Sequence, residues 1–326
     1  MNQSIEVVTC RACGGNNAKD WLHPREMMFG LREVFSYFRC GDCGCLQLMT
    51  LPDKMEPYYP EGYYSYEVMS GLSPSLGSRL KRKWIYPAMT KSKLGWPGAW
   101  GSWLRSLGNG PVLPHWFPYL KGPIPLGLSI LDVGCGSGEL LLGLRNCGFK
   151  NVLGVDPYVS SSIVYDGGIE VRKCQLKEVE GRFGLIMFHH VFEHVEDPKQ
   201  TLLEAKNLLQ KGGQILIRIP VSDSAACEKY RENWVQLDAP RHITLQTRDS
   251  MEVLARQLGL RIENVVYDST ALQFWGSEQY CNDIPLMDSR SNSTHPDELK
   301  VFNDEAVRLN ELGRGDQAAF VLVVDS

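Results

Sequence analysis

Residues 128–139, LSILDVGCGSGE, decide the fold. The apolar run before the glycines predicts a buried strand, and the leucines that follow predict a helix ending at Gly148. Gly134, Gly136 and Gly138 lie between them and let the backbone approach a ligand closely, at a helix N-terminus that favours negative charge. A strand, a glycine turn and a helix begin a Rossmann-like α/β unit.

A carboxylate follows the next predicted strand. Residues 151–156 form a short apolar run that ends in Asp156, and a carboxylate at this position can accept both hydroxyls of an adenosine ribose. The glycines are spaced G-x-G-x-G, whereas the dinucleotide fingerprint is G-x-G-x-x-G. The spacing therefore disfavours an NAD-binding domain.

Several segments occur in an order that resembles the class I S-adenosylmethionine-dependent methyltransferases, over most of residues 125–326. They are residues 131–138, 154–157, 183–198, 211–220 and 240–244. The resemblance implies an α/β, Rossmann-like sheet of seven strands, with S-adenosylmethionine as the methyl donor. Gly184 stands where this branch often has Asp, a departure that we expect to be structural.

The resemblance also assigns the cofactor site residue by residue. The third predicted strand, residues 169–174, lacks an acid that many relatives place near adenine, and Gln175 is the substitute expected there. The residues expected to hold S-adenosylmethionine are Asp132, Gly134, Cys135, Gly136, Gly138, Asp156, Pro157, Gln175 and His189.

Histidines are the candidate catalytic residues. Methyl transfer is an in-line displacement that mainly requires alignment, but a hydroxyl or activated carbon must also lose a proton, which suits imidazole. His189 and His190 end the fourth strand, and strand alternation favours His190 as the one facing the cleft. His242, in a later loop, is expected to be either a base or a loop anchor. Glu193 and His194 are interpreted as a helix-start hydrogen-bond pair.

Five of the ten cysteines lie in the first 45 residues. Cys10 and Cys13 form one C-x-x-C-G knuckle, and Cys40 and Cys43 form a second. The spacing lets both thiolates of a knuckle reach one ion, and the glycine permits a turn that aims N–H groups at sulfur. Four thiolates predict a closed, structural zinc site, with Cys45 as a packed neighbour.

Residues 68–131 contain no Asp or Glu and carry a charge of +8, against −12 for the rest of the chain. Five of the eight tryptophans lie there. Three interpretations remain open: a surface for an anionic substrate, a peripheral membrane contact through residues 79–121, and an interdomain packing segment. No nucleic-acid motif is present, so nucleic acid is not expected as a partner.

The first part of the chain suggests the acceptor. A cysteine ribbon followed by residues 43–48 and a tyrosine-rich turn at 58–66 resembles the zinc-binding leader of bacterial sugar methyltransferases. The resemblance implies O-methylation of a saccharide, as nucleotide sugar or lipid-linked glycan, in surface polysaccharide or secondary-metabolite biosynthesis. The alternatives are methylation of another small molecule and a zinc-ribbon binding module on a methyltransferase scaffold.

Length and composition fit a globular protein of about two domains. The 326 residues are 43% apolar and 22% charged with a net charge of −4, which excludes disordered, collagenous, coiled-coil and histone-like classes. We expect a zinc ribbon at residues 1–50, a basic Trp/Tyr-rich linker region at 51–124 and the methyltransferase domain at 125–326. No membrane span or signal-peptide pattern occurs, which predicts a cytoplasmic protein, either free or associated with a membrane surface.

Overall fold

The computed structural model describes residues 8–60, 113–122, 124–289 and 296–325. Residues 61–112, which include most of the basic, tryptophan-rich segment and of the expected membrane contact, lie outside the described part. The chain forms two compact units. Unit 1 comprises Met1–Pro60, His190–Leu203 and Ile217–Ser326, and unit 2 comprises Glu61–His189 and Glu204–Leu216. The domain boundaries expected from the sequence stay a proposal beside this division.

Eight strands form the larger sheet, in the order β11-β12-β9-β8-β4-β5-β7-β6. Their bounds are β4 Ser129–Val133, β5 Asn151–Val155, β6 Ile163–Tyr165, β7 Ile169–Arg172, β8 Phe183–His189, β9 Leu209–Pro220, β11 Leu260–Tyr267 and β12 Gln317–Val324. Seven of these are the strands expected from the sequence, which confirms the Rossmann-like α/β prediction. The additional strand, β6, runs antiparallel to β7, because Gly167 and Gly168 adopt positive φ and reverse the chain between them.

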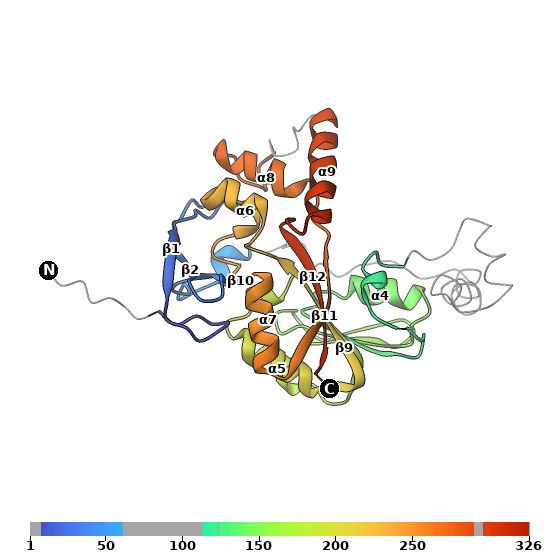
Figure 1. The fold of residues 1–326 in the computed structure, drawn as a ribbon. Helices are drawn as coiled ribbons and strands as arrows, with labels where there is room; N and C mark the ends of the chain where they lie inside the picture. Colours follow the sequence, from blue (N-terminus) through green and yellow to red (C-terminus); the bar gives the residue numbers. More distant parts are fainter. Residues whose placement is uncertain (1–7, 61–112, 123, 290–295, 326) are drawn as a thin grey trace. The chain divides into compact units, whose positions relative to one another are not determined.

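Parallel pairing builds the core of unit 2. Strand β4 is central, and its Leu131 lies opposite Leu153 of β5 and Ile186 of β8. Helix α4 (Glu139–Asn146), green in Figure 1, follows β4 and buries Leu141 and Leu144. Its N-cap, Gly138, has φ +87°, and a Cβ there would lie 2.7 Å from a methyl of Val171 on β7. The turn therefore requires glycine at this position.

A second, four-stranded antiparallel sheet lies in unit 1, in the order β1-β2-β3-β10. Its strands are β1 Ala18–Leu22, β2 Tyr37–Cys40, β3 Leu46–Leu48 and β10 Thr244–Leu245. Three strands come from the cysteine-rich leader and the fourth from a segment about two hundred residues later; Figure 1 shows β1, β2 and β10 together. The leader is thus completed by a late part of the chain.

Helices and short turns make up the remaining described elements. The helices are α5 Pro198–Asn207, α6 Ala225–Tyr230, α7 Arg248–Gln257, α8 Leu272–Cys281 and α9 Pro296–Glu311. The 3-10 turns are η1 Glu56–Tyr58, η4 Phe117–Tyr119, η5 Leu176–Glu178, η6 Phe192–His194, η7 Arg231–Asn233 and η8 Val235–Leu237. Within the described ranges, no helix has both the length and the apolar composition that crossing a membrane demands.

A buried ion network connects the leader to the later segments of unit 1. Arg241 and Glu26 are both fully buried, and their side chains are 2.8 Å apart. The same guanidinium binds Asp238 through two contacts of 2.5 and 2.9 Å, and donates to the Tyr58 carbonyl at 3.1 Å. Burying a charge is costly unless it is paired, so these four residues are interdependent.

Replacing the buried cation tests this network. Arg241→Ala leaves the buried carboxylate of Glu26 and the partly buried carboxylate of Asp238 without their cation, and we expect the free energy of unfolding to fall by about 3–5 kcal/mol. Urea denaturation measures the change. Arg308→Ala removes an exposed ion pair with Glu305 and is the matched control, with a much smaller expected loss because solvent screens the pair. Equal, small losses for both variants would contradict the assignment.

Asp132, on β4, is only 3% exposed. Burial, reinforced by the charge of Asp156, raises its pKa to about 8. The folded protein therefore keeps a proton that the unfolded chain releases above about pH 4. Because the folded state binds more protons in this window, stability falls as pH rises from about 4 to about 8.

Asp132→Asn removes this titration. We expect the native chain to lose up to about 1.4 kcal/mol of unfolding free energy per pH unit relative to the variant, over the window just given. Urea denaturation at several pH values provides the comparison. The exposed substitution Asp304→Asn should keep the pH dependence of the native chain, and parallel curves for the native chain and Asp132→Asn would count against the raised pKa.

Candidate functional site

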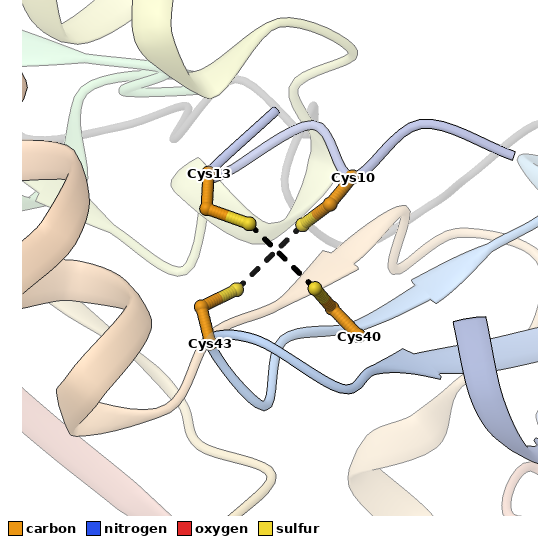
Figure 2. Close-up of side chains that lie close together, drawn as sticks. All are labelled: Cys10, Cys13, Cys40 and Cys43. Atoms are coloured by element: carbon orange, nitrogen blue, oxygen red, sulfur yellow. Dashed lines mark hydrogen bonds between the residues drawn. The ribbon is translucent and has the colours of Figure 1, made fainter. Parts of the chain in front are cut away.

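Four cysteine side chains converge in unit 1, as Figure 2 shows. Their sulfur atoms all lie within 4.8 Å of one another, and the Cys10–Cys43 and Cys13–Cys40 sulfurs are each 3.6 Å apart. All four thiols are free, and a disulfide would hold its sulfurs about 2.05 Å apart. A tetrahedral zinc ion with Zn–S bonds of about 2.3 Å separates its sulfurs by about 3.8 Å. The sulfur positions therefore fit the ion expected from the sequence.

Both knuckles turn at a glycine with positive φ, and the amides of these glycines are directed to carbonyls rather than to sulfur. Gly14 and Gly44 have φ values of +81° and +79°, and each amide donates to the carbonyl of the knuckle's first cysteine at 2.9 Å. The Gln47 side-chain amide lies 3.0 Å from the Cys10 sulfur. Cys45, expected as a packed neighbour, is fully buried. N–H groups aimed at sulfur favour the thiolate, which is the form that binds metal.

Asp156 braces the glycine loop of unit 2. One of its carboxylate oxygens accepts the Gly136 amide at 2.9 Å, and the other accepts the Tyr158 amide at 2.8 Å. The three glycines of residues 134–138 have φ values of 69°, 53° and 87°, and the Cys135 thiol between them donates to the Gly136 carbonyl at 3.5 Å. Each carboxylate oxygen can accept a further hydrogen bond, so Asp156 can still receive a ligand hydroxyl. This bracing role was missed by the sequence analysis.

The other residues expected at the cofactor site have different surroundings within unit 2. Pro157, directly after Asp156, is exposed. Gln175 is the N-cap of η5, and its backbone amide donates to the Glu178 carboxylate at 2.7 Å. His189 is the last residue of β8, and its ring centroid is 5.0 Å from that of the buried Trp116. Their roles toward the cofactor stay predictions.

A buried carboxylate and two imidazoles meet in unit 1. The ligand-type atoms of Glu193, His194 and His242 all lie within 4.8 Å of one another. Glu193 is fully buried, and neither of its side-chain oxygens has a hydrogen-bond partner in the part of the chain that the structure describes. Its Oε1 is 3.5 Å from His190 Nδ1 and 4.0 Å from His242 Nε2. The hydrogen-bond pair expected between Glu193 and His194 is not formed, because His194 Nδ1 is directed to the Arg241 carbonyl instead.

Backbone carbonyls fix both imidazoles of this cluster. His194 Nδ1 is 2.8 Å from the Arg241 carbonyl, and His242 Nδ1 is 2.7 Å from the Gln236 carbonyl. A carbonyl oxygen only accepts, so Nδ1 carries the hydrogen and the lone pair of each ring is on Nε2. Burial lowers the pKa of His242 to about 4, so its ring is neutral near pH 7.

His190 is held from the opposite side by two residues that the sequence analysis missed. Its φ of +54° is unusual for a residue with a side chain. The Arg218 guanidinium lies 2.8 Å from His190 Nε2 and 2.6 Å from the Asp268 carboxylate. A guanidinium only donates, so His190 accepts at Nε2 and directs its Nδ1 hydrogen toward Glu193. No local motif marks Arg218 on β9 or Asp268 after β11.

Residues 110–265 match a family described as a methyltransferase domain. The chain is 35% identical over 106 residues to the human mitochondrial ubiquinone biosynthesis O-methyltransferase, a match that covers 28% of each protein. It is 28% identical over 146 residues to a tRNA U34 carboxymethyltransferase of Actinobacillus succinogenes, covering 41% of this chain and 42% of the relative. The chain thus spans less than half the length of these relatives.

Among solved structures, a SAM dependent methyltransferase from Archaeoglobus fulgidus aligns with a TM-score of 0.38 at 19% identity, over 71% of this chain and 96% of the other.

The family match and the described fold agree over the same residues. The matched range includes β4, the glycine loop, α4 and Asp156, in the order expected for a nucleotide-type ligand at the end of a parallel strand. The matched range, residues 110–265, therefore resembles a methyltransferase domain and has the Rossmann-like α/β fold expected of one.

Proposed function

We propose that this chain transfers a methyl group from S-adenosylmethionine to a saccharide hydroxyl, on a nucleotide sugar or a lipid-linked glycan, in surface polysaccharide or secondary-metabolite biosynthesis. The glycine loop braced by Asp156 is the observation that supports the donor. The resemblance of the cysteine leader supports the acceptor class, together with the +8 charge of residues 68–131, which suits an anionic diphosphate. The membrane contact proposed for residues 79–121 is consistent with a lipid-linked acceptor.

Asp156 and the glycine loop of unit 2 are the residues proposed to bind the methyl donor. Asp156 would accept the ribose hydroxyls, and the loop of residues 134–138 would let the donor approach its backbone. The hydrogen bonds from the Gly136 and Tyr158 amides hold the Asp156 side chain in one orientation. This side chain therefore loses little conformational entropy when the donor binds. The bound donor supplies a methyl group on a sulfonium, which is a good leaving group.

Proton removal from the acceptor hydroxyl is assigned to a histidine. His242 is neutral near pH 7 and keeps its lone pair on Nε2, whereas His190 Nε2 already accepts a hydrogen bond from Arg218. These contacts favour His242 over His190, which strand alternation preferred. His189 stays a predicted contact of the donor.

The names of two relatives suggest other acceptors for the methyl group. The human relative is named an O-methyltransferase of ubiquinone biosynthesis, which agrees with oxygen as the target atom but suggests a different small molecule. The Actinobacillus relative is named for a tRNA, so RNA has to be included among the acceptors tested. A binding module on a methyltransferase scaffold is the alternative without catalysis.

Transfer of labelled methyl groups tests the proposal. The full chain is incubated with S-adenosylmethionine labelled in the methyl group and, separately, with nucleotide sugars, lipid-linked glycans, small aromatics and tRNA, and mass spectrometry locates the label. We expect label on an oxygen of a sugar. Label in aromatics or tRNA alone would refute the saccharide, and donor binding without transfer to any pool would favour the binding module.

Asp156→Ala should weaken binding of the donor. Loss of the charge-assisted ribose contacts, together with loss of the brace on Gly136, is expected to cost about 1–3 kcal/mol, which is about 5- to 150-fold in Kd. Calorimetry with S-adenosylhomocysteine measures it. Asp166→Ala, in the exposed turn between β6 and β7, is the control and should leave Kd unchanged, and an unchanged Kd for Asp156→Ala would refute the ribose role.

We also propose that the four cysteines of the leader bind a structural zinc ion. Their sulfur spacing supports this, and β3 joins the leader to β10, so loss of the ion should lower the stability of unit 1 as a whole. Cys40→Ser should lose one zinc ion per chain by mass spectrometry and lower the melting temperature. Cys281→Ser changes an exposed thiol outside the cluster and should keep both properties. Equal zinc content of the two variants would exclude the site.

A further inference from the structure

Three groups that present lone pairs face one another in unit 1. A glutamate carboxylate accepts hydrogen bonds, and the Nδ1 atoms of His194 and His242 are directed to the carbonyls of Arg241 and Gln236, which leaves Nε2 of each ring as the atom able to bind a ligand. Converging lone pairs repel unless a cation lies among them, and burial strengthens that repulsion. Within the described ranges, the Glu193 carboxylate in this cluster has no hydrogen-bonded cation.

The separations in the cluster distinguish an ion from a shared proton. A hydrogen bond between nitrogen and oxygen joins atoms about 2.7–3.2 Å apart. Glu193 Oε1 and His242 Nε2 are 4.0 Å apart, and both oxygens of Glu193 are buried without a hydrogen-bond partner among the described residues. Metal–ligand bonds of about 2.1 Å separate two ligand atoms by about 3.4 Å at a tetrahedral angle and by up to about 4.2 Å when the ligands lie on opposite sides of the ion. The distance is too long for a direct hydrogen bond and lies within reach of one ion that binds both atoms at a wide angle.

We propose that Glu193, His194 and His242 bind a divalent first-row transition-metal ion of the Zn²⁺ class, at a site separate from the four cysteines. Two imidazole nitrogens and one carboxylate oxygen are a ligand set typical of such ions. Three protein ligands leave at least one coordination position open. The proposal concerns unit 1 alone and does not rest on the acceptor proposed above.

The residues around the cluster have the roles expected of outer-shell partners. Metal-bound histidines usually donate their other ring N–H to a carbonyl, as His194 and His242 do here. His190 Nδ1 lies 3.5 Å from Glu193 Oε1, and Arg218 orients the His190 ring through its Nε2. Such contacts fix the direction in which ligands present their lone pairs.

The other nearby carboxylate already has its cation. Asp238 Oδ2 is 3.8 Å from His242 Nε2, but Asp238 makes two short contacts with the Arg241 guanidinium. Glu193 has no comparable partner among the described residues. Of the two carboxylates, Glu193 is therefore the one that lacks a paired cation, and it lies beside both imidazoles.

An ion at this site changes the expected chemistry of His242. An imidazole nitrogen that ligates a metal cannot take a proton, so the ion would replace His242 as the group that acts on a bound hydroxyl. A divalent ion lowers the pKa of a hydroxyl or water bound at an open position. Metal binding and base catalysis are therefore competing assignments for the same Nε2.

The test is metal binding by the full chain, stripped of metal and then titrated with Zn²⁺ and Co²⁺. We expect two Zn²⁺ ions per chain by mass spectrometry, and one in Glu193→Gln and in His242→Gln. With Co²⁺, these variants should keep the intense charge-transfer band of a thiolate site, which shows that the leader is folded and loaded. Cys40→Ser should lose the thiolate charge-transfer band and still bind one ion at Glu193, His194 and His242.

His23→Gln is the matched control, because it removes an exposed histidine elsewhere in unit 1 and should keep two ions per chain. Arg218→Lys, a change in a positioning residue, should weaken only the second ion, by about 10-fold or more. A native chain that binds a single ion, or a Glu193→Gln variant that keeps two with unchanged affinity, would overturn the proposal. Methyl transfer is measured separately, so its failure would not affect this result.

Discussion

The buried guanidinium of Arg241 is the interaction on which unit 1 depends. Its two carboxylate partners are Glu26, in the cysteine-rich leader, and Asp238, in the loop before β10. Separating either carboxylate from Arg241 would leave a charge without its ionic partner in the protein interior. The backbone carbonyl of the same arginine accepts from His194, and the next residue is His242, so one ionic network fixes the place of both imidazoles.

The cysteine leader has a structural role beyond its own small fold. Strand β3 pairs with β10, the Tyr37 hydroxyl donates to the His242 carbonyl at 2.8 Å, and the Thr247 hydroxyl donates to the Cys43 carbonyl at 2.9 Å. A small ribbon has little apolar core, so these contacts and the proposed metal supply much of its order. The backbone around His242 is therefore held by the leader as well as by its own loop.

Parts of the candidate site follow from local sequence and others do not. The cysteine knuckles and the glycine loop were predicted because their turns need glycine at positive φ within a few residues of the ligand atoms. The bracing of Gly136 by Asp156 was missed, since it joins residues on two different strands. Strand alternation favoured His190, which directly follows β8, but the contact of this residue with Arg218 depends on a partner from β9.

The sequence by itself determined the fold class, the order of the strands along the chain and the four cysteines able to share one ion. These features depend on patterns that repeat or close over short distances: apolar runs, glycine turns and C-x-x-C spacing. Only the tertiary structure decided that β6 joins the sheet, that β10 completes the leader's sheet and that Glu193 lies among three histidines with no hydrogen-bonded cation among the described residues. Each of these rests on which distant or irregular segments pack together, and on which buried charges then find partners, and no local pattern encodes that outcome.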